Sequence, residues 1–142
     1  MPGSPRSFIA VAVLAALLVT CNTRTPERWL IPEGYVGWLV VQYDNAACAP
    51  LPIAGGYYVL RVSSSGRLCT SDKVVGGEAF DKFEYVKSDG TTTEIDQRTM
   101  VSGGMVSSTG RRFKFIGTEQ QRRSSPDTAD ALDARCTSDL RC

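Results

Sequence analysis

The stretch that decides the fold is YVGWLVVQY, which occupies residues Tyr35–Tyr43. Most of its positions hold aromatic or β-branched residues, and these residue types favour β-strands. The four residues before it, Ile31–Gly34, include the proline and the glycine of a turn. This is the strongest strand signal in the chain, and it indicates a fold built from β-structure.

Five further segments have the composition or the alternation of strands. They are Tyr57–Val62 (YYVLRV), Leu68–Ser71 (LCTS), Lys82–Lys87 (KFEYVK), Thr91–Ile95 (TTTEI) and Arg112–Ile116 (RFKFI). Alternation in the last segment places Phe113 and Phe115 on one face. The sequence between Thr25 and Gly117 shows no helical period of useful length. We therefore predict an all-β domain over residues 29–119, a small antiparallel β-sandwich, with a small barrel as the alternative.

The N-terminal region has the order of an export signal. Arg6 and the α-amino group precede Phe8–Val19, an apolar run without charge, as in the charged and apolar regions of a secretory signal. As a helix, this run would span about 18 Å, which is short of the roughly 30 Å of a bilayer core. The sequence therefore predicts a signal helix that directs export and does not remain as a spanning segment.

The apolar run is followed by Leu18-Val19-Thr20-Cys21, which resembles the cleavage motif of bacterial lipoproteins. Thr20 departs from the Gly, Ala or Ser preferred before the cysteine. The resemblance implies a lipoprotein signal peptide over residues 1–20, a diacylglyceryl group and a palmitate-type acyl chain on Cys21, and a tether over residues 21–28. Asn22, rather than Asp, follows Cys21, and by resemblance to the sorting of enterobacterial lipoproteins this implies an outer-membrane location facing the periplasm; ordinary secretion is the alternative.

The chain holds five cysteines. Assigning Cys21 to lipid leaves Cys48, Cys69, Cys136 and Cys142, an even number in a compartment that favours disulfides. Of the three connectivities, we favour Cys48–Cys69 with Cys136–Cys142, and the alternative pairs Cys136 with a thiol of the core. A zinc site is not expected, because no Cys-x-x-Cys pair occurs.

The chemical inventory argues against catalysis. The chain has 16 basic and 15 acidic residues and no histidine. The scattered charges do not suit a nucleic-acid partner, and the commonest general base and metal ligand is missing. We expect no catalytic residue, no cofactor and no metal site. A histidine-free hydrolase that uses paired carboxylates is the alternative.

Residues 120–142 form a polar tail. The order Ser125-Pro126-Asp127 predicts a helix start, and we expect a short helix over Asp127–Arg135. The tail also carries the second expected disulfide.

Several motifs resemble a family of uncharacterised small bacterial domains. They are Ile31–Trp38 (IPEGYVGW), Gly56-Tyr57-Tyr58, Ser65–Leu68 (SGRL) with Thr70-Ser71, and Phe115–Glu119 (FIGTE). This resemblance covers residues 29–119 and implies no catalytic residue.

Four aromatic residues, Tyr35, Trp38, Tyr57 and Tyr58, are candidates for a binding surface, with core packing as the alternative. We predict a lipid-anchored protein of the bacterial cell envelope that acts as a non-catalytic binding or accessory module. Its expected partners are the membrane, through the lipid, and an envelope protein. An envelope inhibitor or a secretion-system lipoprotein is the alternative function.

Overall fold

The computed structural model of the chain describes residues 23–138. The elements in chain order are β1 (Glu27–Pro32), β2 (Gly37–Gln42), β3 (Ile53–Ala54), β4 (Tyr57–Arg61), β5 (Arg67–Cys69), β6 (Lys82–Val86), β7 (Thr92–Glu94), α1 (Gln97–Met100), β8 (Val101–Val106), β9 (Arg111–Ile116), α2 (Glu119–Arg123) and α3 (Ala129–Ser138).

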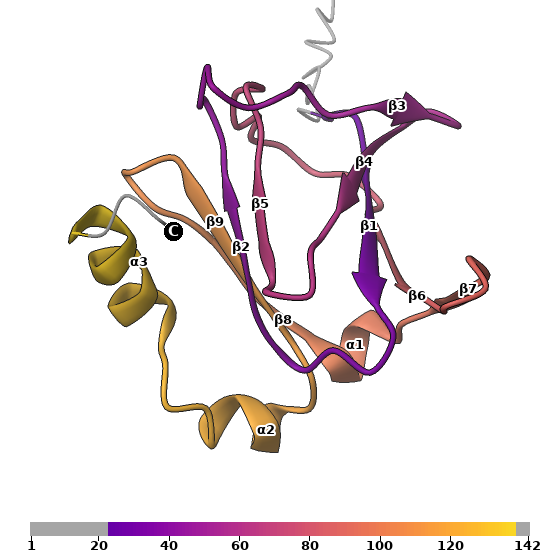
Figure 1. Cartoon of the computed structure of the whole chain (residues 1–142), viewed down its shortest axis with the longest axis vertical. Helices are drawn as coiled ribbons and strands as arrows, with labels where there is room; N and C mark the ends of the chain where they lie inside the picture. Colours follow the sequence, from indigo (N-terminus) through magenta and orange to yellow (C-terminus); the bar gives the residue numbers. More distant parts are fainter. Residues whose placement is uncertain (1–22, 139–142) are drawn as a thin grey trace, which may run out of the picture.

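The strands form two sheets that face each other (Figure 1). The first sheet has the order β3-β4-β1-β6-β7, and the second has the order β5-β2-β9-β8. The predicted all-β sandwich is confirmed. Within residues 23–138 the sheets do not join into the closed barrel that was the alternative.

The sheets are mixed, so the prediction that all strands are antiparallel was wrong. The central strand β1 is parallel to both of its neighbours, β4 and β6, and β2 is parallel to β5. The chain passes from β1 into the second sheet at β2 before it returns to the first sheet. A strand that is reached by such a crossover can lie parallel to the strand from which the chain left. The tight connections, such as that between β6 and β7, do give antiparallel pairs.

The predicted strands correspond to β2, β4, β5, β6, β7 and β9, whereas β3, β8 and the central strand β1 were missed. The sequence of β1, ERWLIP, contains two charged residues and ends in proline, so the composition does not favour a central strand. Each of the two charged side chains forms an ion pair with a residue on a strand that lies far away in the sequence. Arg28 pairs with Glu84 on β6, and Glu27 pairs with Arg112 on β9.

The core between the sheets contains mainly large apolar side chains. Trp29 stacks on Phe83 with ring centroids 5.5 Å apart, and Leu39, Leu60 and Ile116 surround them. This cluster holds the two sheets together through burial of apolar surface.

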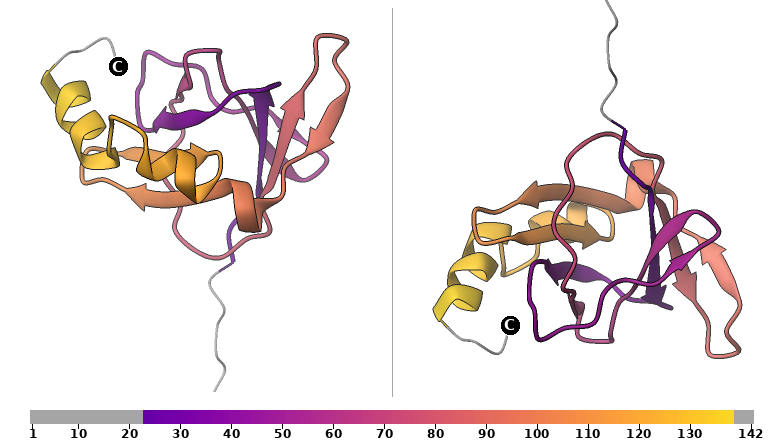
Figure 2. Two further views of the ribbon diagram at one scale, coloured as in Figure 1. Left: turned by 90° about the horizontal axis from the view of Figure 1, so that it is seen from below. Right: turned by 90° about the horizontal axis from the view of Figure 1, so that it is seen from above.

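A second apolar cluster lies on the outer face of the second sheet. Val40 and Phe113 pack there against Leu132 and Cys136 of α3, so the C-terminal helix covers this face (Figure 2). The helix starts two residues later than the predicted Asp127, because Thr128 accepts a hydrogen bond from the Ala131 backbone N–H at 3.2 Å. Burial on both faces explains the continuous apolar run within β2.

Candidate functional site

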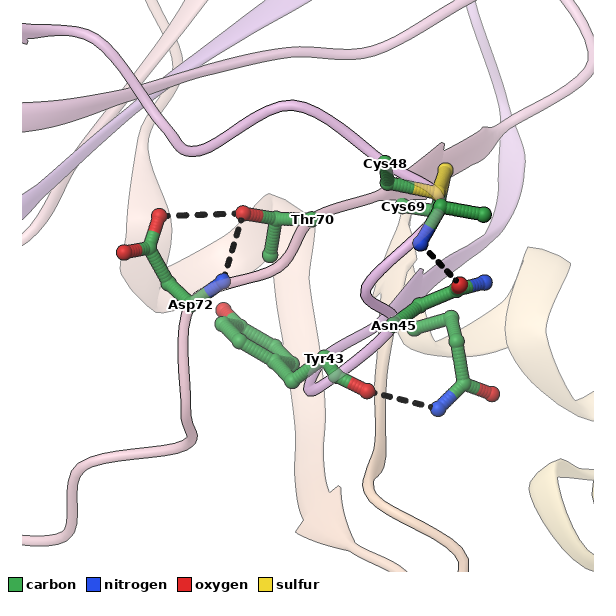
Figure 3. Close-up of a disulfide and its surroundings, with 8 residues drawn as sticks. Tyr43, Asn45, Cys48, Cys69, Thr70 and Asp72 are labelled. Atoms are coloured by element: carbon green, nitrogen blue, oxygen red, sulfur yellow. Dashed lines mark hydrogen bonds between the residues drawn. A yellow bond between two sulfur atoms is a disulfide. The ribbon is translucent and has the colours of Figure 1, made fainter.

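The predicted disulfide between Cys48 and Cys69 is present, with the two Cα atoms 5.8 Å apart (Figure 3). Because these thiols bond each other, the alternative pairing of Cys136 with a core thiol was wrong. Cys136 is itself disulfide-bonded. Its predicted partner Cys142 and the predicted lipidation residue Cys21 lie outside the described residues.

Hydrogen bonds reinforce the disulfide by tying its two flanking segments together. The Asp72 carboxylate accepts from the Leu51 backbone N–H at 2.6 Å and from the Thr70 hydroxyl at 3.0 Å. The Asn45 backbone N–H donates to the Thr70 carbonyl at 3.0 Å. The connection from β2 to β3 is therefore held against β5 by covalent and polar contacts.

Two of the four predicted surface aromatics, Tyr35 and Trp38, lie at the second sheet, and both side chains donate hydrogen bonds within the protein. The Tyr35 hydroxyl donates to the Trp38 carbonyl at 2.7 Å, and the Trp38 indole N–H donates to the Asp127 carbonyl at 2.9 Å. An added Cβ at Gly66 would lie 2.0 Å from the Tyr35 hydroxyl oxygen. Tyr35 therefore occupies a close-packed position that requires glycine beside it.

Tyr57 and Tyr58 lie on β4 in the other sheet. Adjacent residues of a strand point to opposite faces. Tyr58 packs against the core between the sheets, whereas the Tyr57 ring lies 5.2 Å from the Lys82 ammonium group. The four aromatic residues are thus distributed over the two sheets, and they do not meet in one patch.

A buried charged cluster, missed by the sequence reasoning, lies between the sheets. We define the Glu27 cluster as Glu27, Trp29, Tyr43 and Arg112. Arg112 Nη1 lies 2.6 Å from each carboxylate oxygen of Glu27. Tyr43 OH and Trp29 Nε1 donate to the same carboxylate, each at 3.2 Å.

Glu27 and Arg112 are 5% and 6% exposed, which is rare for charged residues unless they are paired. A carboxylate has about four lone-pair positions, and these contacts occupy both oxygens of Glu27. The carboxylate therefore has little capacity left to bind a further hydrogen-bond donor, such as a group of a substrate. The arrangement suits a structural link between the sheets better than acid–base catalysis.

Lys114 also enters the space between the sheets, two residues along β9 from Arg112. Its ammonium group lies 5.3 Å from the Phe83 ring centroid and 5.9 Å from that of Trp29. Burial, and then the charge of Arg112, lower the pKa of Lys114. The aromatic faces offset part of the cost of burying this cation.

One signal in the sequence could have indicated these inward charges. Arg112 and Lys114 alternate with Phe113 and Phe115 in β9, so a sheet covered on one side only would leave one set in water. A strand that is covered on both sides needs a buried partner for the inward charges. Glu27 supplies that partner for Arg112, but it lies 85 residues away in the chain.

Several clefts indent the surface that residues 23–138 form, and two of them concern the ends of the domain. The larger of these two, which we call the N-terminal cleft, has a volume of about 740 Å³; its lining includes Thr23, Arg24, Pro26, Tyr57, Glu78 and Phe80. The tail cleft, of about 500 Å³, lies between the second sheet and the segment that leads to α3; its lining includes Trp38, Gly103, Gly104, Arg122, Asp127 and Thr128.

The N-terminal cleft lies where the described chain begins. Thr23 forms a bridge to Glu78, and the Arg24 backbone N–H donates to the Glu78 carbonyl at 3.2 Å. The Arg24 guanidinium pairs with Asp81 at 2.5 Å. The chain is thus attached to the domain from Thr23 onward.

The model of a family of unknown function (DUF6843) matches residues 23–137. The chain belongs to this family. The matched DUF6843 segment includes every strand and nearly all of α3, so the family match covers the tail helix as well as the sandwich. The expectation that the chain contains a domain of an uncharacterised family is confirmed.

Solved structures include one protein with a similar fold. It is a crystal structure described as "Putative Lipoprotein from Bacillus anthracis", with a TM-score of 0.62 and 23% sequence identity over 82% of this chain and 91% of that chain. This likeness shows that the two proteins share a fold. No curated protein matches the DUF6843 chain.

Two further observations concern residues 23–138. None of the helices there has the length and apolar character needed to cross a membrane. The same residues include no group of three or more cysteine, aspartate or glutamate side chains placed to hold a metal ion.

We expect the Glu27 cluster to make folding sensitive to alkaline pH through Tyr43. Burial, and then the charge of Glu27, raise the pKa of Tyr43 above the ordinary value of about 10. The unfolded chain then loses this proton at lower pH than the folded chain, so stability is retained below about pH 10 and falls as the pH rises further. The free energy of unfolding, measured by chemical denaturation at a series of pH values above about 10, should fall less steeply with pH for Tyr43→Phe than for the wild-type chain. Equal slopes of this free energy against pH for the two proteins would contradict the prediction.

Proposed function

We propose that this DUF6843 protein is a lipid-anchored protein of the bacterial cell envelope, and that its sandwich serves as a non-catalytic binding or accessory module. The observation that carries the proposal is the short distance along the chain between Cys21 and the fold. Cys21 ends the Leu18-Val19-Thr20-Cys21 motif, and Thr23 already pairs with Glu78. Two residues span at most about 7 Å.

This arrangement suits an anchored domain, because a lipid on Cys21 would hold one defined end of the sandwich close to the bilayer. Two or more acyl chains give stable attachment, since each buried methylene contributes about 0.8 kcal/mol. The shared fold with the protein described as a "Putative Lipoprotein" agrees with the proposal. The finer placement that we propose, an outer membrane with the domain in the periplasm, is supported by Asn22 after the cysteine.

The non-catalytic role is supported by how the buried polar groups are used. Both oxygens of the Glu27 carboxylate are hydrogen-bonded within the protein. The carboxylates of Asp81 and Asp133 likewise pair with arginines. The tail cleft offers a surface for an envelope protein, which is the partner class that we propose.

The anchor is tested by expressing the full chain with its own signal in a Gram-negative host. We expect it to float with membranes and to have the intact mass of a chain cut before Cys21 and acylated on that residue. Cys21→Ser should remove both properties, whereas the matched neighbour variant Asn22→Ser should retain the acyl mass. A soluble wild-type chain without acyl mass would overturn the anchor.

A further inference from the structure

The end of the domain that carries Thr23 exposes three large apolar side chains. Phe80 is 95% exposed, Ile53 66% and Val75 54%. Phe80 lines the N-terminal cleft beside Thr23. Large apolar side chains exposed together mark an interaction surface more often than single ones do.

Strand pairing places these residues at one end of the first sheet. Tyr58 on β4 pairs with Glu27 at the start of β1 and with Ile53 on β3. Val75 lines a small cavity with Glu27 and Tyr58. Figure 1 shows β3 and the first described residues together at the upper end of the molecule, with α1 and α2 at the lower end.

The loop that carries Val75 and Phe80, residues 73–80, has features suited to a lipid surface. The loop contains two glycines, Gly76 and Gly77, and begins with the exposed Lys73. A second exposed lysine, Lys82, lies two residues beyond the end of the loop. One exposed acid, Glu78, lies within it. Basic residues near exposed apolar side chains favour contact with anionic phospholipid headgroups.

We propose that Ile53 and the loop 73–80 form a membrane-docking surface, with the Phe80 ring inserted among phospholipid headgroups. This inference rests on the proposed anchor at Cys21, because the chain reaches Thr23 within two residues of that cysteine. The lipid would bring the bilayer to this end of the sandwich. Docking would then fix the orientation of the domain, so that the α2 end points away from the membrane and is available to an envelope partner.

The test places a photo-reactive residue in the full chain within host membranes. The variant Phe80→p-benzoylphenylalanine is compared with Val36→p-benzoylphenylalanine. Val36 is also exposed, at 46%, but it follows the far end of β1, about 17 Å along the strand from Glu27. After irradiation and flotation, we expect a mass increase of one phospholipid at position 80 and no such adduct at position 36.

The possible results distinguish the docking proposal from the anchor proposal. Flotation with a lipid adduct confined to position 80 supports both. Flotation with no lipid adduct at position 80, with equal adducts at both positions, or with only a protein adduct at position 80 overturns the docking surface and leaves the anchor in place. A chain that does not float overturns the anchor and, with it, the docking surface.

Discussion

Replacing Arg112 with methionine is expected to lower the free energy of unfolding by about 3–5 kcal/mol, the usual cost of removing one partner of a buried ion pair. Arg112 is 6% exposed, and its guanidinium contacts both carboxylate oxygens of Glu27. Without it, the hydrogen bonds that the Glu27 carboxylate keeps within residues 23–138 are those from Tyr43 and Trp29. Those neutral donors cannot replace a buried cation. Equilibrium denaturation in urea measures the loss.

Two controls separate the ion pair from its surroundings. The double variant Glu27→Leu with Arg112→Met should recover most of the loss, because it removes both charges and keeps apolar volume. Arg28→Met breaks a more open pair, since the Arg28 side chain is 37% exposed beside Glu84; it should cost at most about 1 kcal/mol. An Arg112→Met variant as stable as Arg28→Met would contradict the structural role of the Glu27 cluster.

Replacing both Cys48 and Cys69 with alanine is expected to lower the free energy of unfolding by about 3 kcal/mol, from the entropy of closing the loop between them. The two cysteines are separated by 21 residues and are bonded in the folded chain. The bond ties the connection after β2 to β5, a three-residue strand at the edge of its sheet. Without it, the Asp72 hydrogen bonds to Leu51 and Thr70 hold that connection.

Reductant provides the control for the disulfide prediction. Urea denaturation of the wild-type chain with reductant should show a loss at least as large as that of the alanine variant without it. Any further effect of reductant on the alanine variant reports the bond at Cys136. A variant with the same urea midpoint as the oxidised wild-type chain would show that the Cys48–Cys69 bond contributes nothing to stability.

Local sequence patterns predicted much of the sandwich but little of the internal polar structure. The aromatic and β-branched run at Tyr35–Tyr43 and the alternation in Lys82–Lys87 correspond to β2 and β6, because strand preference is a property of neighbouring residues. The parallel pairing around β1 could not be predicted in this way, since it depends on crossovers between the two sheets.

The candidate surface aromatics show a similar limit. The sequence identified Tyr35, Trp38, Tyr57 and Tyr58 as large side chains with polar tips, but it could not show that the first two bind backbone carbonyls within the protein. The apolar end formed by Ile53, Val75 and Phe80 also arises only on folding, because β3 and the loop 73–80 converge at the start of β1.

By itself, the sequence determined which residues share a face. In β9, it placed Phe113 and Phe115 on one side and Arg112 and Lys114 on the other. Only the tertiary structure decided which side faces the opposite sheet, and the phenylalanines lie on the outer face while the cations point inward. The physical reason is that alternation defines two faces without ranking them. The packing of α3 on one side and the Glu27 carboxylate on the other made the charged face the inner one.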